Sequence, residues 1–345
     1  ANPAELRAQL DSYLANVDPR RVEAPAPVAA PRSAAVSSSS RSAPMSTLGI
    51  TVRTGQTAAP EADSLPSQAG RVKALVSPHA GYRYSGPTAA WGFSSIDRAA
   101  VRKIFVLGPS HHVPLDHVAL PNSAIEAYET PFGLIPLDVP ILNELRATRS
   151  FSEFSVRQDE EEHSVEMQLP FVKHVMRDQE FTLIPMVVGS TSPSTEAAYG
   201  KILSRFFEMP DTLFIISSDF CHWGERFGYT SLMEGPGVNT PLLPPVSYPT
   251  ERYPVNAGIE LLDRVGMEHI TAQDLKSFQH YLGEHKNTIC GRHPICVFLE
   301  ILQCCRVKCE VRFVHYSQSQ EMRREPRPTE SCVSYASGVC CMCRA

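Results

Sequence analysis

The sequence predicts an α/β fold, a three-layer sandwich in which helices cover both faces of a central, mostly parallel or mixed β-sheet. Two observations support this class. From Arg71 onward, short apolar runs of strand length alternate with longer segments of helical periodicity. Several of these apolar runs also end in turns that contain proline or glycine. Alternation of this kind implies a sheet whose strands are joined by helices that pack on its two faces.

The expected elements follow in chain order. The first is a helix at 3–15, because Leu6, Leu10 and Leu14 recur every four residues and Pro3 lies near its start. Further helices are expected at 86–97, 138–148, 163–177, 195–208, 254–265, 271–282 and 293–303. Strands are expected directly before His79 and His111, and at 181–188, 213–217, 308–317 and 331–339.

Composition divides the chain into folded and flexible parts. Residues 1–16 form a helix of the same domain that occupies 71–339. Residues 17–70 between them are rich in proline, alanine and serine, and such a segment buries too little apolar surface to offset its ordering entropy. We therefore expect a flexible insertion at 17–70, a long loop near the site at 228–251, and a cysteine-rich tail with exposed, reduced thiols at 340–345.

Bulk properties exclude several classes of protein. The formal net charge is −5 and the pI is about 6.2, which gives no electrostatic reason to expect nucleic-acid binding. No apolar stretch approaches the ~20 residues of a transmembrane helix, and no apolar N-terminal signal is visible, although the chain does not begin with Met and an upstream segment remains an open alternative. The ten cysteines show no regular disulfide spacing, so we expect reduced thiols and a cytoplasmic protein without membrane partners.

Histidines follow three of the expected strands at the point where each strand ends. His79 and His111 follow the first two strands, and His222 follows the strand at 213–217 together with Asp219. In open α/β sheets, ligands collect outside the carboxyl ends of the strands, so these side chains are expected to converge and could share a metal ion. A single histidine after a strand more often caps a turn or satisfies a buried backbone group, and Asp219 fits either an orienting carboxylate for His222 or a cap of the chain that follows it.

Two further segments carry chemically active side chains. Residues 159–162 are acidic and are expected to be a solvated helix start, followed by His163 and Glu166 on one helix face. This pair suits a metal site, a supporting contact or an ordinary ion pair. Cys290 fits a buried small side chain, and the residues after it fit the start of a helix.

Taken together, five segments resemble the MEMO family (mediator of ErbB2-driven cell motility). These segments are Pro78-His79-Ala80-Gly81-Tyr82, Leu107-Gly108-Pro109-Ser110-His111-His112, Glu162-His163-Ser164-Val165-Glu166-Met167-Gln168-Leu169-Pro170, Ser217-Ser218-Asp219-Phe220-Cys221-His222-Trp223-Gly224 and Thr288-Ile289-Cys290-Gly291-Arg292-His293-Pro294. The resemblance covers about 71–338 and the helix at 3–15. It implies a fold like that of the class III extradiol dioxygenases, such as the LigB subunit of protocatechuate 4,5-dioxygenase.

The resemblance also implies roles for individual residues. The metal ligands of the dioxygenases match His79, His111 and Cys290, and the acid/base group matches His222 beside Asp219. The remaining pocket residues are Tyr82, His112, His163, Glu166, Trp223, Arg292 and His293. Cys290 stands where the dioxygenases have Glu. Because a thiolate is softer than a carboxylate, the expected ion is Cu or Fe, with Zn as a further option, and ring cleavage is disfavoured.

The function implied by the resemblance is a metal-binding protein with a repurposed dioxygenase-type pocket. Its output is expected to be Cu or Fe redox chemistry on an unknown small molecule, binding of a signalling partner such as a phosphotyrosine peptide, or both. An anionic peptide could use Arg292 and the imidazoles. The alternative is a non-haem iron extradiol-type dioxygenase acting on a small aromatic substrate.

Overall fold

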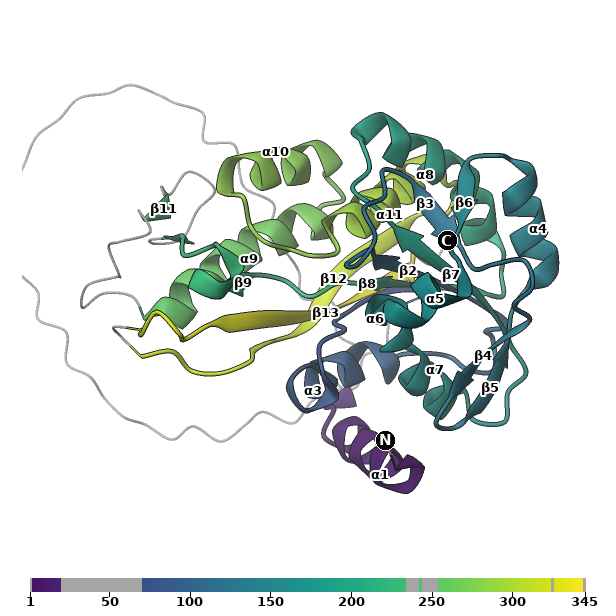
Figure 1. Cartoon of the computed structure of the whole chain (residues 1–345), viewed down its shortest axis with the longest axis horizontal. Coiled ribbons are helices and arrows are strands. Elements are labelled where there is room, and N and C mark those ends of the chain that lie inside the picture. Colours follow the sequence, from purple (N-terminus) through teal and green to yellow (C-terminus); the bar gives the residue numbers. More distant parts are fainter. Residues whose placement is uncertain (1, 20–69, 234–241, 244–253, 324–325, 344–345) are drawn as a thin grey trace, which may run out of the picture.

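A nine-stranded sheet forms the centre of the computed structural model, which describes residues 2–19, 70–233, 242–243, 254–323 and 326–343 (Figure 1). The four central strands are parallel to one another, in the order β1, β8, β2, β7. Their bounds are Val72–Ser77, Thr212–Ser217, Lys103–Pro109 and Thr182–Val188. The mostly parallel core of the sheet confirms the predicted class.

Shorter or antiparallel strands extend the sheet on both sides. The β13–β12 hairpin continues it beyond β1, and β9 pairs with β13. On the other side, β3 runs antiparallel to β7 and pairs with β6. The bounds of these strands are β13 Cys332–Met342, β12 Cys309–Gln318, β9 His222–Trp223, β3 Val118–Leu120 and β6 Phe151–Glu153. Two small hairpins complete the strands: β4 Ala127–Thr130 with β5 Gly133–Pro136, and β10 Leu232–Met233 with β11 Leu242–Leu243.

Helices cover both faces of the sheet, as Figure 1 shows, with α1, α3 and α7 below it and α8 and α11 above it. Their bounds are α1 Pro3–Ala15, α3 Tyr82–Phe93, α7 Leu169–Met176, α8 Pro193–Glu208 and α11 Arg292–Cys304. The others are α4 Val139–Ala147, α5 Val156–Glu161, α6 His163–Glu166, α9 Val255–Thr271, α10 Leu275–His285 and the 3₁₀ turn Glu225–Phe227.

The apolar core lies between the sheet and these helices. Phe105 of β2 and Phe214 of β8 are fully buried and stack with ring centroids 4.4 Å apart. Burying one such side chain contributes roughly 1.5–3 kcal/mol. The core therefore holds the ends of the central strands as rigid supports for the residues that follow them.

The segment predicted as one helix at 163–177 is instead two. The structure has α6 at His163–Glu166 and α7 at Leu169–Met176, with Pro170 in the first turn of α7. Proline lacks an N–H and cannot continue the hydrogen-bonding pattern of a preceding helix. The break points Gln168 inward, where its side-chain amide donates to the carbonyl of Pro78 at 3.0 Å.

The acidic run at 159–162 was expected to be a solvated helix start, and this is wrong. Asp159 and Glu161 lie in the second half of α5, which Ser155 caps through a capping box. Glu162 lies between α5 and α6 and is 4% exposed. Its side chain accepts from the N–H of Ser164, so it caps α6 instead of facing water.

The cysteine-rich end also differs from the prediction. β13 continues to Met342, so Cys340 and Cys341 are buried in the sheet, and only Cys343 of the predicted tail cysteines is exposed. Most of the predicted insertion, 20–69, and most of the predicted loop, 234–241 and 244–253, lie outside the described residues.

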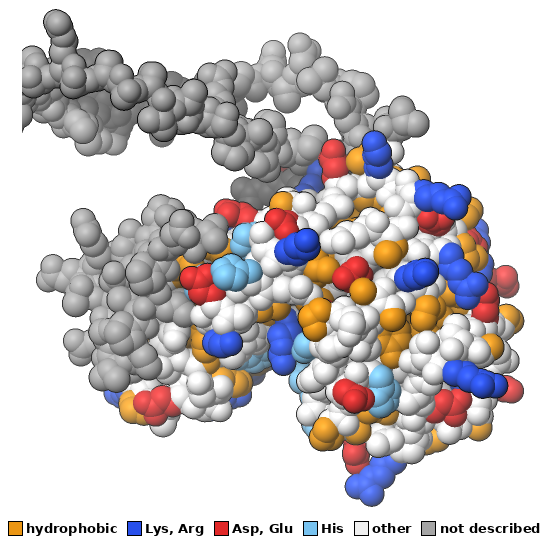
Figure 2. Space-filling model, turned by 90° about the horizontal axis from the view of Figure 1, so that it is seen from above, with side chains coloured by type: hydrophobic (Ala, Val, Ile, Leu, Met, Phe, Trp, Pro, Cys, Tyr) orange, Lys and Arg blue, Asp and Glu red, His pale blue; other side chains and the backbone are white. Residues whose placement is uncertain are grey.

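The surface carries acidic and basic side chains intermixed, as the face in Figure 2 shows over its described part. This distribution agrees with the modest net charge of the sequence and gives no extended basic surface on that face. No helix in the described ranges is long and apolar enough to cross a bilayer.

Candidate functional site

The carboxyl ends of three neighbouring strands meet at one edge of the sheet and carry the expected histidines. β8 lies between β1 and β2 and is parallel to both, with Ser77 beside Ser217 in the register. His79 follows β1, His111 follows β2, and Asp219 follows β8. Three segments far apart in the sequence are therefore brought together by topology alone.

His79 is buried and presents one ring nitrogen to the site. Its Nδ1 lies 2.9 Å from Oγ of Ser217, and that hydroxyl donates to the carbonyl of Ser164 at 2.7 Å. Because the hydroxyl proton is used there, Nδ1 of His79 is the donor and Nε2 keeps its lone pair. Burial, together with the neighbouring imidazoles, lowers the pKa of His79 to about 4, although Asp219 opposes the shift. His79 is therefore a neutral imidazole near pH 7, which is the form that binds metals.

A buried carboxylate fixes His111 in the same way. Glu162 accepts from the backbone N–H of His111 at 2.7 Å and lies 2.9 Å from its Nδ1. Burial by itself would raise the pKa of Glu162, but hydrogen bonds from His111 and Ser164 outweigh burial and lower the pKa to about 2. An ionised carboxylate only accepts, so Nδ1 of His111 carries the proton and Nε2 is available as a ligand.

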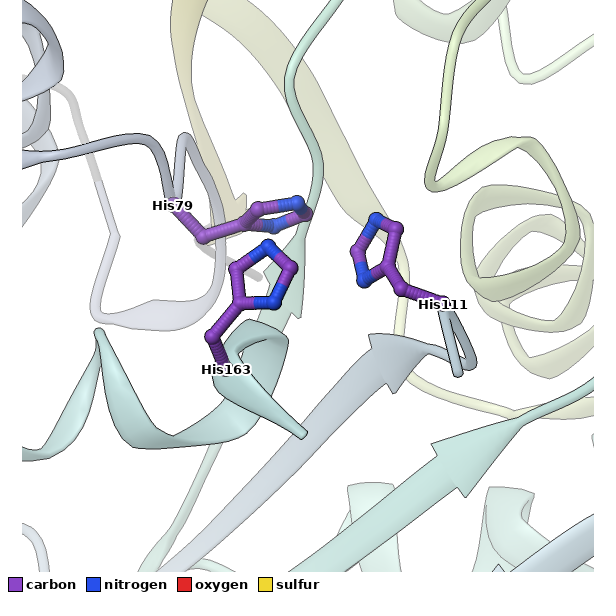
Figure 3. A group of neighbouring side chains, drawn as sticks. All are labelled: His79, His111 and His163. Carbon is purple, nitrogen blue, oxygen red and sulfur yellow. The ribbon is translucent and has the colours of Figure 1, made fainter. Parts of the chain in front are cut away.

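His163 is the third member of this group (Figure 3). It is the first residue of α6, and its ring stacks on that of His111 with centroids 4.4 Å apart. Its Nδ1 lies 3.7 Å from the same carboxylate oxygen of Glu162. One ligand atom from each of His79, His111 and His163 lies within 4.8 Å of the other two. Sequence reasoning placed His163 in the pocket, whereas the structure brings it as close as the two strand-end histidines.

Cys290 lies beside the imidazole group. Its Sγ is 3.3 Å from Nε2 of His79 and accepts from the N–H of Asp219, also at 3.3 Å. Burial, and then the charge of Asp219, raise the pKa of the Cys290 thiol well above its usual range. The thiol is therefore protonated near pH 7, and ionising it requires a cation bound beside it.

His222 is arranged as a base. Its Nδ1 faces two carbonyls, those of Phe220 at 2.9 Å and Thr288 at 3.1 Å. Carbonyls only accept, so the proton resides on Nδ1 and the lone pair is on Nε2. The hydroxyl of Thr288 also accepts from the backbone N–H of His222 at 2.7 Å, which fixes the position of the residue.

Asp219 supports His79 in the structure. Its Oδ1 accepts from the backbone N–H of His79 at 2.8 Å and from that of Ala80 at 3.3 Å. The carboxylate therefore caps the turn that carries the first histidine. This differs from both expected roles, because Asp219 caps the turn of His79 and not the chain that follows it, and the ring of His222 is oriented by backbone carbonyls.

Three of the other expected pocket residues lie on the side of α3 and α6. The hydroxyl of Tyr82 donates to the carbonyl of Met167 at 2.8 Å and joins these two segments. His112 is exposed, and its ring centroid is 5.9 Å from that of His163. Glu166 is also exposed.

The remaining three expected residues lie on β9 and α11. Trp223 is buried in β9, opposite Cys332 of β13. Arg292 is half-buried and donates to the carbonyl of Ile289 at 3.4 Å. His293 pairs with the buried Glu196 of α8, with 2.8 Å between Nδ1 and Oε1, so it links two helices.

Sequence reasoning missed the residues that orient the imidazoles. Glu162 was assigned to a solvated run, and Ser217 and Thr288 were not weighed as positioning groups. The sequence offers one sign of their role, which is that they lie next to the motif residues. Glu162 directly precedes His163, and Ser217 ends a predicted strand. Metal-binding histidines usually donate their other ring N–H to such a partner.

Two glycines allow the site segments to approach one another. A Cβ on Gly108 of β2 would lie 2.4 Å from Oγ of Ser164 in α6, and a Cβ on Gly291 would lie 2.3 Å from Cβ of Ser218. Both positions are closer than side chains tolerate. The absence of a side chain lets α6 pack against β2 and lets the Cys290 segment pack against the end of β8.

Comparison with known proteins agrees with this arrangement. A family model described as Memo-like protein matches residues 56–339. The chain is 40% identical to Protein memo-1 homolog from Caenorhabditis elegans over 284 residues, which cover 80% of this chain and 75% of that protein. It is 41% identical to Protein MEMO1 from Homo sapiens over 272 residues, which cover 77% of this chain and 84% of that protein.

A solved structure, that of an uncharacterized protein from Escherichia coli K12, aligns with 77% of this chain and 99% of its own at 13% identity, with a TM-score of 0.43. The range that the family model matches includes the strands and turns that deliver His79, His111, His222 and Cys290. The chain therefore belongs to the Memo-like family.

Proposed function

We propose that this chain is a metal-binding protein whose dioxygenase-type pocket holds a redox-active ion of copper or iron. One observation carries the proposal: Ser217 and Glu162 hold Nδ1 of His79 and of His111, which leaves Nε2 of both as a ligand, and the two residues have ligand atoms within 4.8 Å of each other. Zinc also accepts these donors.

The donor set fits such an ion. A neutral imidazole needs no deprotonation to bind a metal, and the low pKa of His79 keeps it neutral near pH 7. An N and an S ligand on one tetrahedral ion are roughly 3.6 Å apart, given metal bonds of about 2.0–2.3 Å. The 3.3 Å between Nε2 of His79 and Sγ of Cys290 is close to that value.

Each protein group has a separate role in this proposal. The bound ion would supply Lewis-acid or one-electron chemistry. His222 would accept a proton from a substrate at Nε2, since its Nδ1–H is held by backbone carbonyls. Asp219 and Glu162 hold the backbone of His79 and of His111, so both turns stay in position.

A second proposal is that the same edge binds a signalling partner through an anionic group such as a phosphotyrosine. The supporting observation is that His111, His112 and His163 are partly or fully exposed at the mouth of the site. Titration with a phosphotyrosine peptide, and with its unphosphorylated form as control, tests this role. Equal affinities would remove it.

The ring-cleaving alternative is tested by oxygen uptake with a panel of catechols after anaerobic loading with Fe(II). Two histidines and a carboxylate are the usual iron ligands of such oxygenases, and Cys290 stands at the carboxylate position. We expect no uptake above the level without enzyme. Formation of ring-opened product in a stoichiometric amount would contradict this expectation and support the dioxygenase alternative.

Metal analysis of protein purified without chelators, and again after loading, tests the metal proposal. We expect about one ion per chain for wild type and loss of binding for the His79→Ala, His111→Ala double variant. His280→Ala is the matched control, because His280 is an exposed imidazole on α10 that lies outside the group. Unchanged metal content in the double variant, with the protein folded, would contradict the proposal.

A further inference from the structure

His79 and His111 have two different neighbours that can act as a third ligand. Cys290 contacts Nε2 of His79 through its sulfur at 3.3 Å. His163 belongs to the group of imidazoles whose ligand atoms lie within 4.8 Å of one another. In the described part of the chain, Cys290 stands beside this group and is not a member of it.

One carboxylate serves both imidazoles on the α6 side. Oε1 of Glu162 lies 2.9 Å from Nδ1 of His111 and 3.7 Å from Nδ1 of His163. The same oxygen accepts from the N–H of Ser164 at 2.9 Å and so fixes the start of α6. The hydrogen bond leaves Nε2 of His111 for a cation, whereas His163 lies beyond hydrogen-bond distance of the carboxylate and is drawn to it by charge.

The ring of His163 is also held on its faces. It stacks on His111 at an interplanar angle of 24°, and its centroid lies 5.6 Å from that of His79. Figure 3 shows the three rings facing one another from β1, β2 and α6. These two ring contacts fix the orientation of the His163 side chain, as a metal ligand requires.

We propose that His79 and His111 bind every metal ion that the site holds, and that Cys290 and His163 are alternative third ligands. The softness of the bound ion determines which of the two binds. This inference rests on the proposed metal-binding function and specifies its ligands. A soft ion such as Cu(I) favours the thiolate, whereas a borderline divalent ion accepts three imidazoles. The chain would then hold copper in two oxidation states with two ligand sets.

The test is a pair of metal titrations on full-length protein and three variants. Cu(I) is measured anaerobically by competition with a chromogenic chelator, and Co²⁺ is measured by its absorption spectrum, in which a thiolate ligand adds a near-ultraviolet charge-transfer band. The variants are Cys290→Ser, His163→Ala and, as control, His280→Ala, an exposed imidazole on α10 outside the group.

We expect a crossed result. Cys290→Ser weakens Cu(I) roughly tenfold or more and changes Co²⁺ little, whereas His163→Ala does the reverse, since loss of even a supporting group costs about 10–100-fold in metal affinity. Wild-type Co²⁺ protein lacks the thiolate band. His280→Ala resembles wild type with both ions.

The outcomes separate the two proposals. If His163→Ala leaves both affinities unchanged while the His79→Ala, His111→Ala double variant of the metal analysis loses binding, the metal site stands and the role of His163 is refuted. If Cys290→Ser and His163→Ala each weaken the binding of both ions, or if wild-type Co²⁺ protein shows a thiolate band, the two residues are not alternatives. One fixed set of four ligands would then hold both ions. Wild-type protein that binds neither ion would overturn the proposed function and this inference together.

Discussion

Glu162 is the residue on which the arrangement of the imidazoles depends most. It is buried and ionised, it holds the backbone and ring of His111, and it caps the helix that begins with His163. Its burial is offset by hydrogen bonds from His111 and Ser164, which keep its pKa at about 2. A carboxylate with these partners is a positioning group for metal ligands.

Glu162→Gln should therefore weaken metal binding without removing a ligand. The amide accepts at one atom only, so His111 loses its acceptor either at its backbone N–H or at its ring, in the second case together with Ser164. We expect roughly 10–100-fold weaker Co²⁺ binding in a calorimetric or optical titration. Glu161→Gln is the control, because Glu161 is exposed and pairs only with Arg157 among the ion pairs of the described residues. Equal affinity of Glu162→Gln and wild type would show that the imidazoles do not depend on this carboxylate.

The pKa of His79 makes a prediction about acid stability. Its folded value, about 4, lies below the ordinary value of 6.5, so between these pH values the unfolded chain binds a proton that the folded chain does not. The free energy of unfolding of metal-free protein should therefore fall as pH drops from 6.5 to 4, with a contribution of up to roughly 3 kcal/mol from this residue.

Urea unfolding of wild type and His79→Gln across this pH range measures that contribution. The variant should lose part of the pH dependence, because glutamine does not titrate. His280→Gln, at an exposed position on α10, should keep the wild-type dependence. Identical pH dependence in wild type and His79→Gln would mean that His79 is not buried as a neutral ring.

At the scale of elements, strand-end geometry was predictable and the packing of α6 was not. β1, β2, β7 and β8 are short runs of mainly apolar residues, so the sequence identifies them and the turns that follow them. The three-residue strands β3 and β6 give no periodicity; β3 pairs with the edge of β7, and β6 pairs with β3. Apolar spacing continues across the break between α6 and α7, so the inward turn of Gln168 depends on contacts that sequence alone does not contain.

Gly108→Ala tests the contact between β2 and α6. The added methyl would meet Ser164 at 2.4 Å from its Oγ and 2.9 Å from its Cβ. Overpacking of this kind costs about 1–3 kcal/mol, and we expect that loss in urea unfolding together with weaker metal binding, since α6 carries His163. Gly283→Ala in α10 is the matched control: a methyl there meets nothing within 4 Å. That variant should keep metal affinity and gain up to about 1 kcal/mol.

Retained stability and metal affinity in Gly108→Ala would contradict this role of the β2–α6 contact. Loss of stability with unchanged affinity would show that the position of α6 does not control the site.

At the scale of the whole molecule, a buried carboxyl joins the site to the far part of the fold. Asp263 of α9 is fully buried and accepts from Asn287 at 2.9 Å, from Tyr316 of β12 at 2.8 Å and from Ser334 of β13 at 2.5 Å. Asn287 directly precedes Thr288, which holds His222. Residues from three separate segments are thus held by one group of a fourth, an arrangement that spacing in the sequence does not reveal.

Asp263→Asn should destabilise the protein and change its pH dependence. Burial raises the pKa of Asp263 to about 6, although hydrogen bonds from Ser334, Asn287 and Tyr316 oppose the shift. Its folded pKa lies above the ordinary 3.8, so this residue favours folding at low pH, and that contribution is lost as pH rises through about 6.

Urea unfolding at pH 4 to 7 measures this contribution. The free energy of unfolding of Asp263→Asn should lack the part of the decline with rising pH that Asp263 causes in wild type. At pH 7 we expect a loss of about 1–3 kcal/mol, because the amide leaves one of its donors without an acceptor. Asp178→Asn, at an exposed position, is the control. A variant as stable as wild type at pH 7 would mean that the network does not hold these segments together.

The most direct test of the account is an anomalous-scattering map of crystals grown from metal-loaded protein, collected on both sides of the absorption edge of the added ion. It reports the identity, the occupancy and the ligands of the ion in one measurement. We predict one peak within bonding distance of Nε2 of both His79 and His111, with Cys290 or His163 completing the site. A peak elsewhere, or none at this edge of the sheet in protein that binds metal in solution, would contradict the central claim.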